Sequence, residues 1–239
     1  MRYKYHFWTA TRATSKTFTA YLAAAVRAVL LPGSNIFIAS DVKGTVIKMA
    51  EAKFEEIWRH WPLLRNELAT RVDDGKSGEK KSGNYYELHF KNGSNITVVA
   101  KDTSRGLRAN FGILEEAATI SEDDYTAVLL PQLNVARREV DGSLNPEEPS
   151  SPQTFITTAR EKTVFMYSRL IELAVMAVVR PQDSFVWGLS YEIPLHFGLV
   201  DKASMLDQRY SKTMNTDTFL RENMSVWTGN NSEAWLDSH

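Results

Sequence analysis

The sequence contains no cysteine, so no disulfide bond is available to hold the fold. It also lacks an apolar run of the ~18 residues that a membrane-spanning helix needs, and its N-terminus lacks a signal-peptide pattern. The histidines and tryptophans are scattered as core or surface residues and form no metal-ligand cluster. These absences favour a soluble protein of a reducing compartment.

No excess of charge of either sign marks a partner. The 28 basic and 29 acidic residues leave a net charge of -1. Contact with nucleic acid would therefore need a local basic patch or a ring of subunits. With 239 residues, 43% of them hydrophobic, the chain can bury a large core. This size fits one large domain, or one domain with a small appended subdomain.

Glycine is missing from the stretch FWTATRATSKTFTAYL (7–22), where a phosphate-binding loop would need it. The usual spacing of that loop is G-x-x-x-x-G-K-[ST], between a strand and a helix. Here Ala10 and Ser15 occupy the two glycine positions. We expect the loop to bind phosphate through Ala10, Thr11, Arg12, Ala13, Thr14, Ser15, Lys16 and Thr17. The alternative is an ordinary helix N-terminus, at which Thr17 satisfies a free N–H group.

Strand and helix patterns alternate around this loop. The run YHFWTA predicts a buried strand, and apolar residues at helical spacing follow it as far as Pro32-Gly33. A second strand, NIFIAS, precedes a long amphipathic helix that ends near Pro62. Two β-runs then flank Lys91-Asn92-Gly93, which indicates a hairpin. The polar stretch 73–83 and the proline-rich stretch 139–152 are expected to be loops.

The centre of the chain places two acids directly after an apolar run. In ANFGILEEAATI (109–120), Glu115 and Glu116 follow Phe111 to Leu114. Such a run is typical of a parallel strand that presents carboxylates at the ligand-binding edge of an α/β sheet. In P-loop enzymes the first acid supports Mg²⁺ and the second activates water. The alternative is a pair of solvated acids that open a helix.

The remaining elements continue the alternation. The run TFITTA predicts a strand that ends in Thr157 and Thr158, which could equally be plain strand-end residues. A helix over 164–179, a late strand in SFVWGLSYEI and two polar helices over 202–211 and 216–227 follow. The order predicts an α/β fold: a mostly parallel central sheet with helices on both faces and an inserted β-hairpin.

Four blocks, in order, resemble the large terminase subunits that package DNA in tailed bacteriophages. They are TATRATSKT, SRGLRANFGILEEAATI, TFITTAREKTVFMYSRL and FLRENMSVW. The resemblance spans about residues 5 to 228 and implies a P-loop NTPase fold of the ASCE/RecA-like type. The glycine replacements and Glu115 in place of the usual Asp depart from the family pattern and predict weak nucleotide binding.

The resemblance also implies a role for each site residue, with ATP and Mg²⁺ as cofactors. Lys16 would neutralise the β- and γ-phosphates, Thr17 and Glu115 would hold Mg²⁺, and Glu116 would activate water. Thr157 and Thr158 would sense the γ-phosphate. Arg105 would reach the ATP of a neighbouring subunit, or else brace its own loop.

An ATPase of a viral genome-packaging motor would have double-stranded DNA, a portal protein and a small terminase subunit as partners. It would be a monomer alone and a homo-oligomeric ring, a pentamer, when assembled, and it would act in the host cytoplasm at the procapsid portal without a membrane. We expect an ATPase core over 1–200, a helical segment over 201–239 and no nuclease domain. The candidates for DNA contact are Lys76, Lys80, Lys81, Arg137 and Arg138. The alternatives are a helicase-like DNA translocase and a non-hydrolysing structural or DNA-binding module.

Overall fold

The computed structural model describes residues 2–40, 45–69, 78–82, 85–100, 106–212 and 214–229, and the side chain of Thr45 is not described. Its centre is an eight-stranded sheet of order β3-β4-β5-β2-β6-β7-β1-β8. The strands are β1 (Tyr5–Ala10), β2 (Asn35–Ser40), β3 (Glu79–Lys81), β4 (Tyr85–His89), β5 (Asn95–Ala100), β6 (Phe111–Glu115), β7 (Gln153–Thr157) and β8 (Ser184–Leu189).

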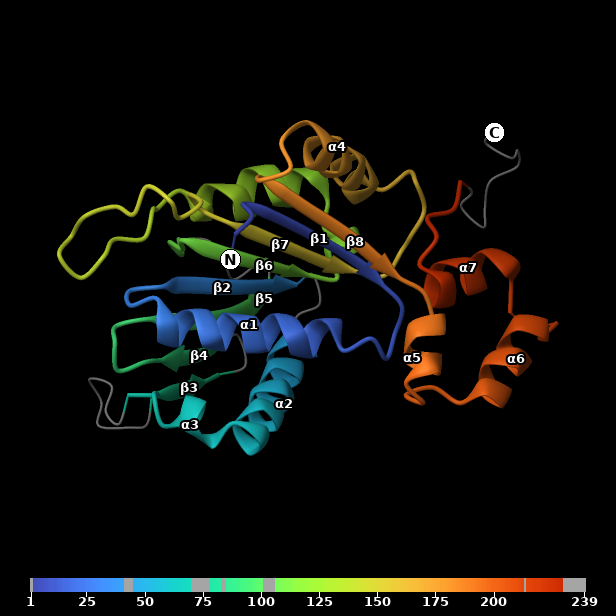
Figure 1. Cartoon of the computed structure of the whole chain (residues 1–239), viewed down its shortest axis with the longest axis horizontal. Coiled ribbons are helices and arrows are strands. Elements are labelled where there is room, and N and C mark those ends of the chain that lie inside the picture. Colours follow the sequence, from blue (N-terminus) through green and yellow to red (C-terminus); the bar gives the residue numbers. More distant parts are fainter. Residues whose placement is uncertain are drawn as a thin grey trace.

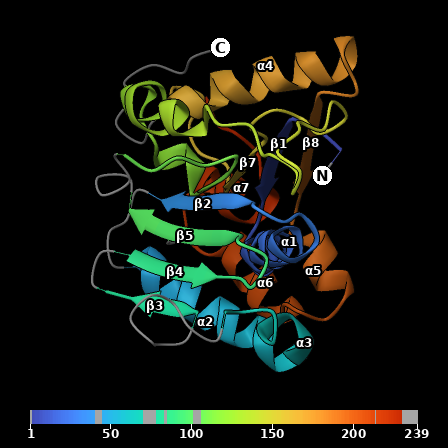
Figure 2. The ribbon, with the colours of Figure 1, turned by 90° about the vertical axis from the view of Figure 1, so that its left-hand side faces the viewer.

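Six of these strands are parallel, and the hairpin extends one edge. Every pairing from β5 through β2, β6, β7 and β1 to β8 is parallel. Strands β3 and β4 pair antiparallel at the far edge, where Figure 2 shows them below β5. The predicted fold class and the hairpin are therefore confirmed. Strand β3 corrects the prediction for 73–83, because part of that polar stretch forms an edge strand.

Helices cover both faces of the sheet, as Figure 1 shows. Helices α1 (Lys16–Leu30), α2 (Thr45–His60) and α3 (Pro62–Arg65) lie on one side, and α4 (Phe165–Val179) lies on the other. Short turns η2 (Ala117–Thr119), η3 (Asp124–Leu129) and η4 (Leu130–Leu133) follow β6. Strand β7 ends at Thr157. The sequence predicted that Thr158 would also belong to this strand, but it lies just beyond the end.

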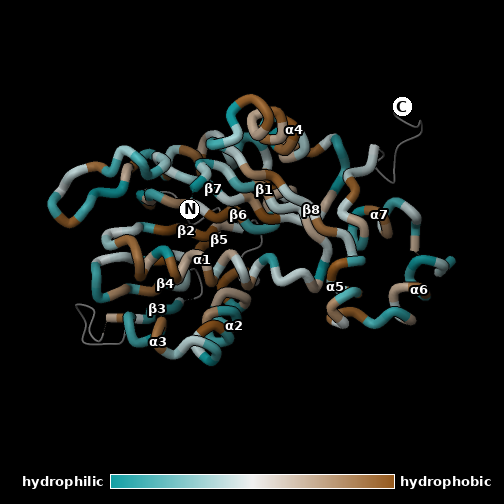
Figure 3. Tube along the Cα trace, viewed as in Figure 1, coloured by the Kyte–Doolittle hydropathy of each residue, from teal (hydrophilic) through white to brown (hydrophobic). Residues whose placement is uncertain are grey.

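The alternation of side chains along β1 divides the core into two layers. Phe7 packs in the cluster on the α4 side, and Trp8 packs in the cluster on the α1 and α2 side. Both residues are buried. Figure 3 shows the hydrophobic residues concentrated in the central strands and the hydrophilic ones in the loops. This two-sided burial explains why the parallel strands are nearly all apolar in sequence.

Three small helices lie beyond the carboxyl ends of the strands, next to the loop that follows β1 (Figure 1). They are α5 (Glu192–His196), α6 (Lys202–Tyr210) and α7 (Thr216–Met224). Asp201 and Asn215 cap α6 and α7 by accepting hydrogen bonds from backbone N–H groups. The described residues include no helix with the length and apolar character that a bilayer span requires.

A buried ion-pair cluster ties the proline-rich stretch to the opposite end of the sheet. Glu148 accepts from Arg27 and from Arg137, and Arg137 also pairs with Glu139 at 2.7 Å. The Arg137 side chain is only 2% exposed. Arg137 therefore stabilises this loop and does not provide a surface for DNA contact. Of the other candidates, Lys81 pairs with Glu51 at 2.5 Å, and Lys76 lies outside the described residues.

Candidate nucleotide-binding site

The loop between β1 and α1 adopts left-handed backbone conformations without glycine. Ala13 has φ of 61° and Ser15 has φ of 56°, both in the region that L-residues rarely occupy. Each such residue costs about 1 kcal/mol, and strain of this kind gathers at ligand sites. Thr14 Oγ1 donates to the carbonyl of Thr11 at 2.7 Å and closes the turn. The chain therefore folds this segment as a compact loop before Lys16 begins α1.

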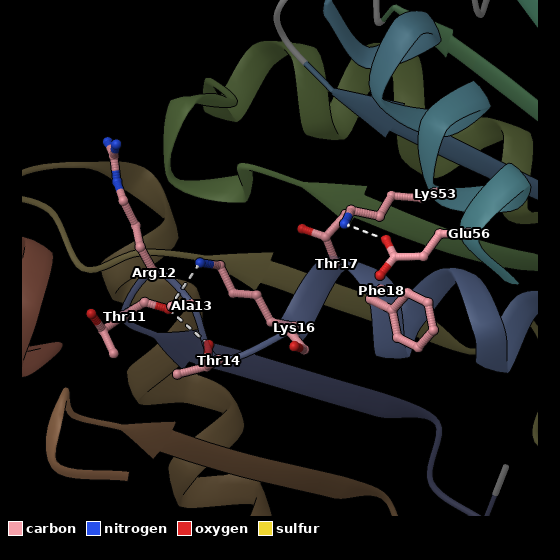
Figure 4. A pocket seen from close by; sticks show the side chains of 10 residues that line it. Thr11, Arg12, Ala13, Thr14, Lys16, Thr17, Phe18, Lys53 and Glu56 are labelled. Carbon is pink, nitrogen blue, oxygen red and sulfur yellow. Dashed lines mark hydrogen bonds and ion pairs between the residues drawn. The ribbon is translucent and has the colours of Figure 1, made fainter. Parts of the chain in front are cut away.

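A cavity of about 310 Å³ lies against this loop, shown in Figure 4. Seven of the eight predicted phosphate-binding residues line it, and Ala10 is instead buried at the end of β1. Its lining is Thr11, Arg12, Ala13, Thr14, Ser15, Lys16, Thr17, Phe18, Lys53 and Glu56. Three of these side chains are basic and one is acidic, so the lining favours an anionic ligand.

Lys16 is a largely buried basic residue of the cavity lining. Its Nζ lies 3.4 Å from the carbonyl oxygen of Thr11. Burial lowers the pKa of Lys16, and the nearby carboxylates of Glu116 and Glu115 partly oppose that shift. The lysine thus contacts the loop and lies close enough to both predicted acids to interact with their charges. A phosphate at this position would restore the favourable environment that burial removes.

Glu115 meets the loop across an intervening strand. It ends β6, which β7 separates from β1, and it is 2% exposed. Thr17 donates to its Oε1 at 2.5 Å, and Tyr21 donates to its Oε2 at 3.0 Å. Burial raises the pKa of Glu115, and these two hydrogen bonds lower it in part. The structure therefore brings together the two residues predicted to hold a metal ion.

Glu116 lies just beyond the strand, in a different environment from Glu115. Its φ of 49° turns the chain away from the sheet, and its side chain is only partly buried. The two adjacent acids are thus divided between a buried position at the end of β6 and a partly exposed position in the turn that follows. Glu116 is therefore a third strained non-glycine position, after Ala13 and Ser15.

Thr157 is the last residue of β7, the strand between β1 and β6, and Thr158 follows it. Thr157 Oγ1 accepts from the N–H of Ala118 at 3.2 Å and donates to the carbonyl of Thr158 at 2.8 Å. Thr157 therefore links the end of β7 to the turn directly after Glu116. Neither threonine lines the cavity, and both are buried. Arg105 lies outside the described residues.

Comparison with known proteins gives structural neighbours but no sequence relatives. No protein-family model matches the chain, and no curated protein matches it. The large terminase ATPase domain of Thermus phage P74-26 superimposes with a TM-score of 0.66 at 13% identity, over 95% of this chain and 90% of that one. This chain has the fold of a large terminase ATPase domain.

Two longer terminases share this fold. The large terminase from a thermophilic bacteriophage, in complex with ADP, has a TM-score of 0.62 at 12% identity. That of bacteriophage HK97 has a TM-score of 0.53 at 13% identity. The two superpositions cover 94% and 97% of this chain, but only 48% and 41% of the length of these neighbours.

Tyr21 and Glu222, which were not among the predicted site residues, contact predicted ones. Tyr21 lies one helical turn after Thr17, a spacing that could have indicated its contact with Glu115. Arg12 Nε lies 3.1 Å from Glu222 Oε2, and Thr11 donates to the carbonyl of Glu222 at 2.7 Å. Helix α7, which overlaps the block FLRENMSVW identified in the sequence, is therefore tied to the loop over a long sequence separation. The block itself did not predict the contact with Arg12.

Proposed function

We propose that this chain is the ATPase of a viral genome-packaging motor, which couples ATP hydrolysis to the movement of double-stranded DNA into a procapsid. The observation that carries the proposal is the 2.5 Å hydrogen bond from Thr17 to Glu115. It joins the first turn of α1, directly after the loop, to the end of β6 in the strand order of an ASCE-type sheet. The terminase fold and the basic cavity support the same conclusion.

The donor set fits a nucleotide with Mg²⁺. The described residues contain no cluster of three or more histidine, cysteine or acidic side chains that could hold a metal alone. Mg²⁺ is commonly bound through one or two carboxylates together with the phosphates of a nucleotide. Glu115 provides the carboxylate, and the Thr17 hydroxyl provides a further oxygen ligand beside it. When bound there, Mg²⁺ would neutralise charge on the phosphates.

Each residue of the site then has a defined role. Lys16 neutralises the β- and γ-phosphates from the loop, and Arg12 adds charge at its rim. Glu116 orients and deprotonates the attacking water from the partly exposed side of the site. Thr157, which bonds to the turn after Glu116, transmits the state of the γ-phosphate together with Thr158. Arg105 supplies positive charge to the site of a neighbouring subunit.

The motor context extends the proposal to partners. We assign a portal protein and a small terminase subunit as docking partners, and a homo-oligomeric ring, a pentamer, as the working assembly. Residues 1–200 form the ATPase core in this proposal, and the segment from 201 packs on it, consistent with the contacts of α7. Nuclease activity would belong to another polypeptide or to a further part of the protein.

The test is nucleotide titration of the purified protein with and without Mg²⁺, followed by steady-state hydrolysis. Lys16→Ala should abolish ATP binding, whereas Lys48→Ala on the exposed face of α2 should not change it. Glu116→Gln should retain binding but lower hydrolysis by ~10²-fold or more. The matched control is Glu122→Gln, an exposed acid shortly after the site, which should leave turnover unchanged.

The outcomes separate the alternatives. Parental ATP affinity in the Lys16→Ala variant would refute phosphate binding by the loop. A parent protein that neither binds nor hydrolyses ATP would favour a structural or DNA-binding module whose altered loop no longer binds nucleotide, for which the strained, glycine-free loop is the specific argument. ATP-driven translocation on DNA that does not depend on a procapsid would favour a helicase-like enzyme.

A further inference from the structure

Lys53 and Glu56 form the wall of the cavity that faces the phosphate loop. Both belong to α2, and both line the cavity together with Lys16 and Thr17 (Figure 4). Lys53 Nζ lies 2.8 Å from Glu56 Oε2 and 6.0 Å from the centre of the Phe18 ring. The pair is thus placed beside the first turn of α1, which carries the phosphate-binding lysine.

Packing between α1 and α2 fixes this wall. The Tyr21 and Phe54 rings lie 5.2 Å apart, and those of Phe18 and Trp61 lie 6.0 Å apart. Phe54 is the residue after Lys53, and Tyr21 is the residue that donates to Glu115. The position of Lys53 is therefore set by the same side chain that holds the predicted metal ligand. Lys53 itself keeps a flexible four-carbon stem that can redirect its ammonium group.

The charge balance of the cavity suggests what the pair does. Among the lining side chains, Arg12, Lys16 and Lys53 are positive and Glu56 is negative. Arg12 is also paired with Glu222 outside the lining, whereas Lys53 is paired with Glu56 within it. An ion pair on a helix surface at i,i+3 contributes little to stability, so exchanging its partner costs little. A phosphate group in the cavity would compete with Glu56 for Lys53, because the hydrogen bond from an ammonium group to phosphate is charge-assisted.

On the basis of the proposed function, we propose that Lys53 is a second phosphate-binding lysine that contacts the terminal phosphate of a nucleoside triphosphate. Glu56 is its resident counterion and is displaced from it when the triphosphate binds. Lys53 then distinguishes a triphosphate from a diphosphate, whereas Lys16 serves both. The alternative is an ordinary surface pair with no part in binding.

The test compares the binding of ATPγS and ADP, each with Mg²⁺, to the parent protein and five variants by calorimetry. Lys53→Met should weaken ATPγS binding by ~10-fold while ADP binding stays within about twofold. Glu56→Gln should tighten ATPγS binding by a few-fold, because it frees Lys53 and removes a negative charge from the wall. The matched controls are Lys48→Met and Glu55→Gln, which change exposed residues of the same helix that do not line the cavity.

Equal weakening of ATPγS and ADP by Lys53→Met, or no change in either, would overturn the proposal. Circular dichroism of each variant excludes unfolding as the cause of a loss. Lys16→Ala provides the reference for the site itself. If that variant loses both ligands while Lys53→Met loses neither, only the role of Lys53 is refuted. If Lys16→Ala binds both as the parent does, the proposed nucleotide site fails and the role of Lys53 fails with it.

Discussion

Tyr21 donates a hydrogen bond to Glu115 Oε2 at 3.0 Å, on the carboxylate oxygen that Thr17 does not use. Tyr21 is fully buried, and its pKa is raised well above the ordinary value by burial and by the neighbouring carboxylate. Its hydroxyl therefore stays protonated and remains a donor. The tyrosine holds the carboxylate in one orientation and satisfies an acceptor that has little access to water.

Removing that hydroxyl should affect both stability and hydrolysis. Tyr21→Phe leaves a buried acceptor without its donor, so we expect the free energy of unfolding to fall by about 1–3 kcal/mol. Hydrolysis should fall while ATP binding is retained, because Lys16 and Thr17 are unchanged. Tyr86→Phe is the control: its hydroxyl donates to Glu79 and not to Glu115, and Tyr86 does not line the cavity. Stability loss with unchanged turnover in both variants would reduce Tyr21 to a structural residue.

Ser15→Gly should stabilise the fold without weakening ATP binding. Ser15 has φ of 56°, a conformation that glycine adopts without the steric cost that a side chain incurs. We expect the free energy of unfolding to rise by up to about 1 kcal/mol and ATP binding to stay equal or tighten. Ser168→Gly, in the exposed part of α4, should instead destabilise the protein, because glycine disfavours a regular helix. Chemical denaturation and ATP titration of both variants check the contrast.

Most of the fold could be predicted from the sequence, because the parallel strands are short apolar runs and the helices after them show apolar residues at helical spacing. The apolar run before Glu115 and the helical spacing after Thr17 predicted the elements that meet in the site. The fold is encoded locally, in burial on both faces of the strands. The pairing order of the parallel strands came from the structure, which places β7 between β1 and β6.

The walls of the site could not be predicted in the same way. Lys53 lies on a helix whose polar face shows no motif, and Glu222 is 210 residues from the arginine that it contacts. Strand β3 was missed because its residues, Glu79 to Lys81, are charged, and only pairing with β4 makes them a strand. Such contacts depend on tertiary packing, which overrides local propensity.

His6 should make the fold sensitive to acid. Burial, with a smaller effect of the N-terminal charge, lowers the pKa of His6 from 6.5 to about 4. Between pH 6.5 and about pH 4, His6 is therefore protonated in the unfolded chain but neutral in the folded chain. Stability should fall as pH decreases through this window. His6→Phe should flatten the dependence, whereas His60→Phe at an exposed position should not. Equal slopes for all three proteins in denaturation across this pH range would contradict this.

Arg105 is expected to act across a subunit boundary. It precedes Glu115 by ten residues, in the block SRGLRANFGILEE that resembles terminases. Phosphoryl transfer develops charge on the γ-phosphate oxygens, and an arginine supplied in trans can accelerate it by ~10³-fold or more. Mixing Arg105→Ala with Glu116→Gln subunits under ring-forming conditions should therefore restore hydrolysis. The active sites would be those in which Arg105 of the Glu116→Gln subunit faces the intact Glu116 of its neighbour. No recovery in rings confirmed by light scattering would mean that the arginine acts within its own subunit or takes no part.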